Sequence, residues 1–251
     1  MKPSIKLIVL IALLPFLFFQ CTENETKPSS QLVKLNIEYT WDNNPFLLNK
    51  AYIWDKGIRK DTITPTKLIY HINNLRLITS DNEKISSKQM YYMFDFEQNT
   101  YLPEAIAFNT AADDKQYTIT AVEFTLGIAD SATNANMLLG NLFPSPMYWG
   151  MVQGYINFKF EALSPKVNAI IYHIGGYLAP YKNSRTLKLN FDKPYLLNKE
   201  NSLTLSADLF KLFNSKHSID LETVNLVHAP NDQSVLIADN MAEIFSFKSL
   251  K

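Results

Sequence analysis

The sequence predicts a mostly β fold, an antiparallel β-sandwich of about eight strands with a few short helices. Three observations support this prediction. Several segments alternate between apolar and polar residues with a period of two, others are apolar at almost every position, and helical patterns are confined to three stretches. Hydrophobic residues make up 47% of the chain and aromatic residues 13%, which is enough for a core and too much for a disordered protein.

The predicted strands fall into two groups. Alternating segments are expected to have one face in the core and one face in solvent, and they cover residues 33–39, 154–161, 187–191 and 203–207. Segments that are apolar on both faces are typical of central strands, and they cover residues 67–79, 90–96, 117–126 and 169–174. Turn residues separate these segments, as in a sandwich.

Helical signals are short. The first stretch, residues 134–142, has Asn134 as a plausible cap. The second, residues 208–213, has room for one or two turns, and the third, residues 234–245, is predicted to form a last helix. No repeat or linker divides the chain after Leu32, so residues 32–251 are predicted to form one domain.

The N-terminus has the pattern of a lipoprotein signal peptide. Lys2 and Lys6 precede an apolar run over residues 7–19, which is short for a membrane span. Residues 1–20 are therefore predicted to be cleaved, the alternative being an uncleaved anchor helix. Cys21 is the single cysteine and is predicted to carry the lipid, since a free thiol is unusual in a secreted protein. The polar residues 21–31 then form a tether.

Composition and motifs exclude several functions. The formal net charge is +0 and no run of Lys or Arg occurs, so a nucleic-acid partner is not expected. Neither a phosphate-binding glycine loop nor a G-x-S-x-G nucleophile motif is present, and no carboxylate pair stands out. The chain is therefore predicted not to be an enzyme.

Two of the four histidines are candidate metal ligands. By strand parity His71 shares a face with Ile69, Leu75 and Leu77, and His173 shares a face with Ala169 and Ile171. Both imidazoles are therefore expected to point toward apolar surroundings. A neutral imidazole there needs a partner for each nitrogen, and a soft metal ion is one such partner. The alternative is a core histidine bonded to backbone or tyrosine. No H-x-x-x-H or C-x-x-C spacing exists, so a metal site would have to join distant strands.

Five landmarks occur in an order that resembles the MbnP-like family of secreted and lipid-anchored bacterial proteins, which is associated with copper. The resemblance spans residues 32–247. Its landmarks are YHINNLRL at 70–77, AVEFTLGIAD at 121–130, MYWGMVQGY at 147–155, IYHIGG at 171–176 and IADNMAEIF at 237–245.

The resemblance implies a sandwich that holds copper through histidines and, in some relatives, through a tryptophan oxidised to kynurenine. His173 matches the family's His-Leu-Gly position, and His71 lies on its Arg-Leu strand. Trp149 matches the first tryptophan of a Trp-x-Trp pair, whereas Met151 stands at the second. Tyr39 stands where many relatives have a histidine. Thioethers would suit Cu(I), and the methionines considered as donors are Met90, Met147 and Met151.

The predicted function is that of a lipid-anchored cell-envelope protein that binds a copper ion through His71 and His173 without catalysis. Its location would be the outer membrane or cell surface, or the periplasmic side, with the lipid on Cys21 as its membrane contact. The alternative is a structural or binding lipoprotein without metal, which contacts glycan or an envelope protein partner.

Overall fold

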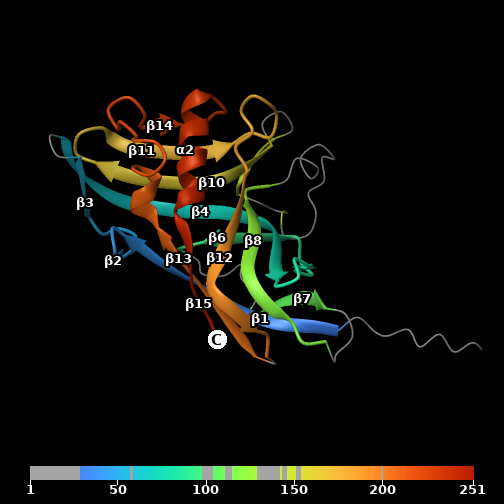
Figure 1. The fold of residues 1–251 in the computed structure, drawn as a ribbon. Helices are drawn as coiled ribbons and strands as arrows, with labels where there is room; N and C mark the ends of the chain where they lie inside the picture. Colours follow the sequence, from blue (N-terminus) through green and yellow to red (C-terminus); the bar gives the residue numbers. More distant parts are fainter. Residues whose placement is uncertain are drawn as a thin grey trace, which may run out of the picture.

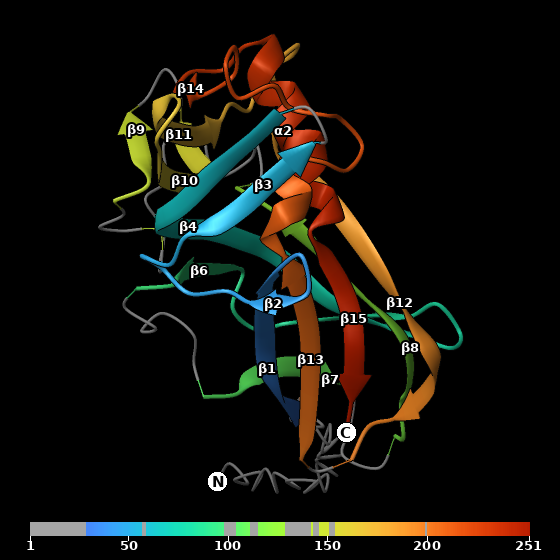
Figure 2. The same cartoon turned by 90° about the vertical axis from the view of Figure 1, so that its left-hand side faces the viewer.

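The computed structural model describes residues 29–56, 59–97, 104–110, 115–128, 142, 146–150, 154–198 and 200–251. Within these residues the predicted fold class is confirmed, because two sheets pack face to face and one α-helix covers one side (Figures 1 and 2). The described residues form the strands β1 to β15, five in one sheet and ten in the other, which is more than the eight predicted. No helix in the described part of the chain is long and apolar enough to cross a membrane.

The smaller sheet has five strands and is built around β1. Its strands are β1 (Ser29–Trp41), β2 (Asn44–Pro45), β7 (Ile106–Thr110), β13 (Asn201–Asp208) and β15 (Phe245–Leu250). β1 begins at Ser29 rather than at Leu32. It pairs in parallel with β13, which departs from the predicted antiparallel order. β1 and β13 are far apart in the sequence, because most strands of the larger sheet lie between them in the chain. No hairpin therefore joins the two strands, and they are free to pair in parallel.

The larger sheet has ten strands, and the longest, β4, runs through its middle. The strands are β3 (Tyr52–Lys56), β4 (Arg59–Thr79), β5 (Lys84–Ser86), β6 (Tyr91–Asp95), β8 (Thr118–Leu126), β9 (Tyr148–Gly150), β10 (Gly154–Ser164), β11 (Asn168–Gly175), β12 (Arg185–Leu196) and β14 (Leu226–Val227). Each of the eight predicted strands is found in one of the two sheets.

Two of the three predicted helical stretches lie among the described residues. Residues 209–212 form a single 3₁₀ turn, η2 (Leu209–Leu212), capped by the Asp208 side chain. The last helix, α2 (Asp232–Glu243), starts earlier than predicted because Asn231 and Ser234 form a capping box. It ends before Phe245, where β15 begins. The predicted helix at 134–142 lies outside the described residues except for Leu142.

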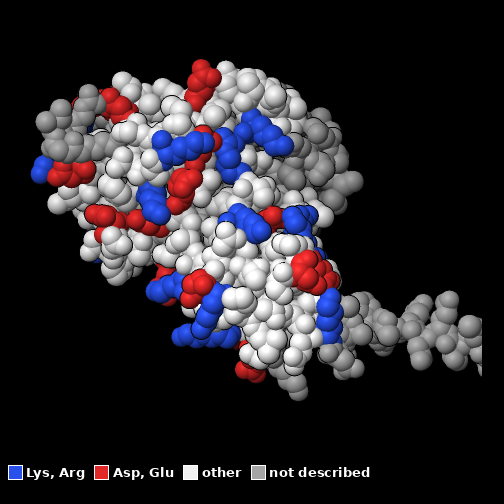
Figure 3. All heavy atoms as spheres, viewed as in Figure 1, with Lys and Arg blue, Asp and Glu red and all other residues white. Residues whose placement is uncertain are grey.

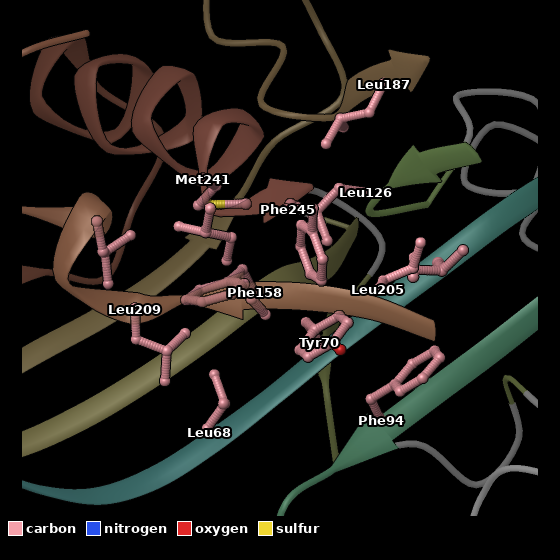
Figure 4. Packing of buried hydrophobic residues seen from close by; sticks show 14 of the residues in the cluster. Leu68, Tyr70, Phe94, Leu126, Phe158, Leu187, Leu205, Leu209, Met241 and Phe245 are labelled. Atoms are coloured by element: carbon pink, nitrogen blue, oxygen red, sulfur yellow. The ribbon is translucent and has the colours of Figure 1, made fainter. Parts of the chain in front are cut away.

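The main core lies between the sheets and is rich in aromatic rings (Figure 4). Tyr70 is at its centre, with ring centroids 4.8 Å from Phe94, 5.9 Å from Phe158 and 5.6 Å from Phe245. These rings come from both sheets, so their burial holds the sheets together. Even-numbered residues of β4 near Tyr70 face this core. The odd-numbered residues there consequently point to the opposite side, which we call the outer face of the larger sheet.

The pairing along one side of β4 changes at His71. Tyr70 pairs with Phe158 of β10 on one side and with β6 on the other. Ile72 still pairs with β6, but its second partner is Leu126 of β8. His71 therefore lies where β8 ends and β10 begins. Gly127 has φ of +104° and follows β8 at this junction, and its N–H donates to the His71 carbonyl at 2.7 Å.

Charged side chains of both signs are interspersed on the face shown in Figure 3, in keeping with the formal net charge of +0. One network joins α2 to its neighbours. There Asp239 forms ion pairs with Arg185 at 2.9 Å and with Lys216 at 2.8 Å.

Candidate metal centre

His71 is held on the outer face with its ring fully buried. Its side chain is 0% exposed, and its Nδ1 lies 3.1 Å from the carbonyl oxygen of Ile156. Ile156 lies near the start of β10, where the register shifts between Ile156 and Phe158. The junction between β8 and β10 thus brings a backbone carbonyl to one nitrogen of the imidazole.

Burial lowers the pKa of the His71 imidazole from its ordinary value of 6.5 to about 4, and the hydrogen bond to Ile156 opposes this only partly. The ring is therefore neutral at neutral pH and carries one N–H. A carbonyl oxygen can only accept, so the proton is on Nδ1 and donates to Ile156. Nε2 then carries a free lone pair.

Nε2 of His71 has no hydrogen-bond partner among the described residues. A buried polar atom without a partner costs about 1–3 kcal/mol. Such atoms in a folded protein call for an explanation, and a ligand is one of the few available. A neutral imidazole whose other nitrogen is fixed by a carbonyl is the form in which histidine binds metals.

The surroundings of His71 on one side are apolar and contain two thioethers. A cluster on the outer face consists of Ile69, Met93, Met147 and Ile156, with Trp149 packed against it. Met93 pairs directly with His71 across β4 and β6, so the two side chains lie on the same face with Cβ atoms about 5 Å apart. Sequence analysis did not single out Met93, because every residue of β6 is buried and parity alone could not choose a face.

On its other side His71 meets a tyrosine-rich cluster. The Tyr155 ring centroid lies 6.2 Å from that of His71, and Tyr155 packs with Tyr91, Ile128 and Leu142. Burial raises the pKa of Tyr155 to about 12, with Tyr148 and Tyr91 adding to the effect, so its hydroxyl stays protonated. That hydroxyl has no partner among the described residues.

Asn73 follows His71 on the same face and is also fully buried. Neither its amide nitrogen nor its amide oxygen has a hydrogen-bond partner in the described part of the chain. The outer face beside the junction thus holds three neighbouring residues with unpaired polar atoms, His71, Asn73 and Tyr155. Sequence analysis missed the last two, since an asparagine and a tyrosine in strands carry no metal signature.

His173 lies on the same face as His71, with one strand between them. It pairs with Lys159 of β10, which pairs with Ile69 of β4. Strand geometry gives a Cα separation between His71 and His173 of roughly 12 Å. Nε2 of His173 lies 2.7 Å from Oε1 of Glu161, toward the β4 residues that precede Ile69 and hence away from His71. The structure therefore places the two predicted ligands on one face without bringing them together.

Trp149 lies over β11. A Cβ added to Gly175 would come within 2.7 Å of Cζ3 of the Trp149 ring, so the indole rests on this glycine. Ile156 pairs with Gly175, which puts Trp149 in the row of outer-face residues that continues from His71. The tryptophan singled out by the sequence is thus next to the apolar cluster of the site.

Two other predicted residues, Tyr39 and Met90, do not lie at His71. Tyr39 pairs with Ala207 in the smaller sheet, and its hydroxyl lies 2.6 Å from that of Tyr70, on the core side of β4. Burial raises the pKa of Tyr39. Met90 is 56% exposed, and the predicted sites Met151 and Cys21 lie outside the described residues.

Carboxylates do not complete a site at His71. Among the residues that the structure describes, no group of three or more His, Cys, Asp and Glu side chains is arranged to hold a metal ion. The uncharged donor atoms near His71 are its own Nε2, the thioethers of Met93 and Met147, the amide of Asn73 and the hydroxyl of Tyr155. The imidazole and the thioethers of this set fit a soft ion such as Cu(I), which such ligands favour.

The fold and the site define a two-sheet β-sandwich with a fully buried, neutral histidine on the outer face of its larger sheet. The model of the MbnP family matches residues 30–233, which is most of the chain, so the protein belongs to the MbnP family. MbnP from Methylosinus trichosporium has a similar fold, with a TM-score of 0.55 and 13% identity. The match covers 88% of this chain and 98% of that one. No curated protein matches the chain in sequence.

Proposed function

We propose that this protein is a lipid-anchored, non-catalytic protein of the bacterial cell envelope that binds copper through histidine, with His71 as the principal ligand. One observation supports the copper site above all. The buried Nε2 of His71 has a free lone pair and no partner among the described residues. Copper bound there would satisfy this atom, and Ile156 would keep the ring in the required tautomer.

The residues present fit copper by their chemistry. Imidazole binds copper in both oxidation states, and the thioethers beside it favour Cu(I). Bound copper would supply a soft Lewis acid in an apolar, largely water-free setting. His173 can join the site only by turning away from Glu161 toward the Ile156 end of β10, so His71 alone is the histidine ligand in the geometry described.

The proposed lipid anchor agrees with the position of β1. Its Ser29 end and the C-terminus lie at one end of the sandwich, whereas β9, β10 and β11 lie toward the other (Figure 2). An anchor at Cys21 would therefore hold the copper site away from the membrane surface, where a soluble or envelope partner could reach it.

The copper proposal is tested by titrating the purified protein with Cu(I) against the chelator bicinchoninate under anaerobic conditions. One equivalent is expected to bind with a Kd well below about 1 μM. Binding no stronger than micromolar would refute the copper site. His173→Ala is expected to change the affinity by less than about threefold. A much larger loss would make His173 a second ligand. Intact mass would show in addition whether Trp149 has gained an oxygen and lost a carbon.

The anchor is tested by Cys21→Ser in the full chain. The wild-type protein is expected in the membrane fraction, because stable lipidation makes membrane attachment persistent. The variant should lose the lipid mass and accumulate as an unprocessed precursor. A variant that is processed and lipidated like the wild type would refute Cys21 as the anchor. Cu(I) binding by the purified variant serves as the control that its domain is folded.

A further inference from the structure

We propose that Met93 is the second ligand of the His71 site, and that this thioether makes the site selective for monovalent soft cations, Cu(I) and Ag(I), over divalent ions. The inference rests on the proposed function and specifies its ligand set. It also predicts which ions the site rejects.

The first support is the pairing of β4 with β6. His71 and Met93 are directly opposed, and both are almost completely buried, at 0% and 3% exposure. Directly opposed residues on antiparallel strands have Cβ atoms about 5 Å apart and point to the same face. The flexible Met93 side chain can therefore bring its sulfur to an ion on Nε2 of His71 without any movement of the backbone.

The second support is the orientation of the imidazole. Because Nδ1 is held by Ile156, the lone pair of Nε2 has one fixed direction. The residues clustered beside the ring are Ile69, Met93, Met147 and Ile156. Of these only the two methionines carry a donor atom, and Met93 is the one paired with His71.

The third support is the charge of the site. His71 and Met93 are both neutral, so a bound ion would keep its full charge in an apolar setting. The solvation energy lost by an ion on burial grows with the square of its charge, so a divalent ion would lose about four times as much as a monovalent one. Zn²⁺ and Cu²⁺ are therefore rejected unless an anionic ligand accompanies them.

Among the described residues, the carboxylates of the outer face nearest to His71 are those of Asp95 and Glu161, and both already have partners. Asp95 is paired with Ile69, and its Oδ1 accepts a hydrogen bond from the backbone N–H of Glu97 at 3.0 Å. Glu161 bonds to His173 at 2.7 Å. Lys159, between these groups on the same face, adds a positive charge that further disfavours a divalent ion.

The test compares Met93→Leu with the control Met241→Leu. Both replace a buried methionine with a side chain of similar volume, but Met241 lies in the main core on α2. Each protein is titrated with Cu(I) against bicinchoninate, with Ag(I), and with Zn²⁺. Met93→Leu is expected to weaken Cu(I) and Ag(I) binding by about 30-fold, whereas Met241→Leu should leave both unchanged. The wild type is expected to bind Zn²⁺ at least about 100-fold more weakly than Cu(I).

X-ray absorption gives a second measurement. The copper-loaded wild type should show a sulfur neighbour that is lost in Met93→Leu and retained in Met241→Leu. Unchanged Cu(I) affinity in Met93→Leu, or Zn²⁺ binding as tight as Cu(I), would overturn the assignment of Met93. The proposed function would survive either result if His71 were still required. Absence of Cu(I) binding in the wild type would overturn both.

Discussion

Replacement of His71 by glutamine is expected to lower the affinity for Cu(I) by at least about 100-fold, equivalent to about 2.7 kcal/mol, while the sandwich stays folded. The glutamine side chain is close in size to histidine and can donate a hydrogen bond to the Ile156 carbonyl in place of Nδ1. It has no nitrogen lone pair for the metal. The variant thus removes the ligand and keeps the structural contact.

The affinity is measured by the same competition with bicinchoninate. His217→Gln is the matched control, because His217 bonds to Asp239 far along the chain from the site. If glutamine at position 71 destabilises the fold, His71→Phe provides a second variant that fills the same apolar space. Equal Cu(I) affinity in wild type and His71→Gln would remove His71 from the site.

Repeating the wild-type titration at pH 5 gives an independent check of this ligand. Protons compete with metal for an imidazole, so a ligand with an ordinary pKa of 6.5 would lose roughly 25-fold in affinity between pH 7 and pH 5. The pKa of His71 is lowered to about 4 by burial, so its site is expected to lose less than about twofold. A steep loss would indicate an exposed ligand instead.

Much of the sandwich could be predicted because strand parity is a local property. The alternation in residues 33–39 and 203–207 identified β1 and β13, and apolar residues on both faces of the segment identified β4 and β8. Parity also put His71 on the face of Ile69, but it wrongly added Leu75 and Leu77. These two leucines lie in the main core, because the register of β4 shifts between Asn73 and Arg76. What parity cannot provide is register, because nothing within one strand states which residue of another strand lies opposite. The parallel pairing of β1 with β13 and the pairing of His71 with Met93 both depend on register.

The last strand was not predicted, although its residues carry a local signal. Phe245, Ser246 and Phe247 alternate as a strand should, yet the helix predicted over residues 234–245 included Phe245. The capping box at Asn231 fixes where α2 begins, and the pairing of β15 with β13 fixes where it must end. The pairing of β15 with β13 thus fixes the boundary between α2 and β15, which the amino-acid composition of this segment does not determine.

Only part of the site could be predicted, because the rest depends on how the strands pair. His71 was recognisable as an imidazole on an apolar face, but its special feature is the change of partner strand at that residue, from β10 to β8. No pattern in the sequence predicts where a strand changes from one partner to another. Tyr39 was a candidate only because the family resemblance implied a histidine at its position in many relatives. In the structure it lies on the core side of β4, opposite His71, and its hydroxyl bonds to that of Tyr70.

Acidification is expected to destabilise the metal-free protein through His71 by about 3 kcal/mol between pH 6.5 and pH 4. Burial lowers the pKa of His71 from 6.5 to about 4, so the unfolded chain binds more protons than the folded protein within this window. The stability is complete above pH 6.5, falls as the pH decreases, and reaches its full loss below pH 4. Tyr155, the titratable neighbour in ring contact, stays neutral throughout because its pKa is raised to about 12.

Urea unfolding of wild type and His71→Gln at pH 7, 5.5 and 4 measures this effect. Other groups titrate in both proteins, so their contributions cancel in the difference. The stability of the wild type relative to His71→Gln should therefore fall by about 3 kcal/mol as the pH decreases through this window. A difference that stays constant with pH would mean that His71 is protonated as readily in the fold as in the unfolded chain. Water would then reach Nε2 and hydrogen-bond to it. The copper proposal would lose its main support, which is a buried Nε2 without a partner.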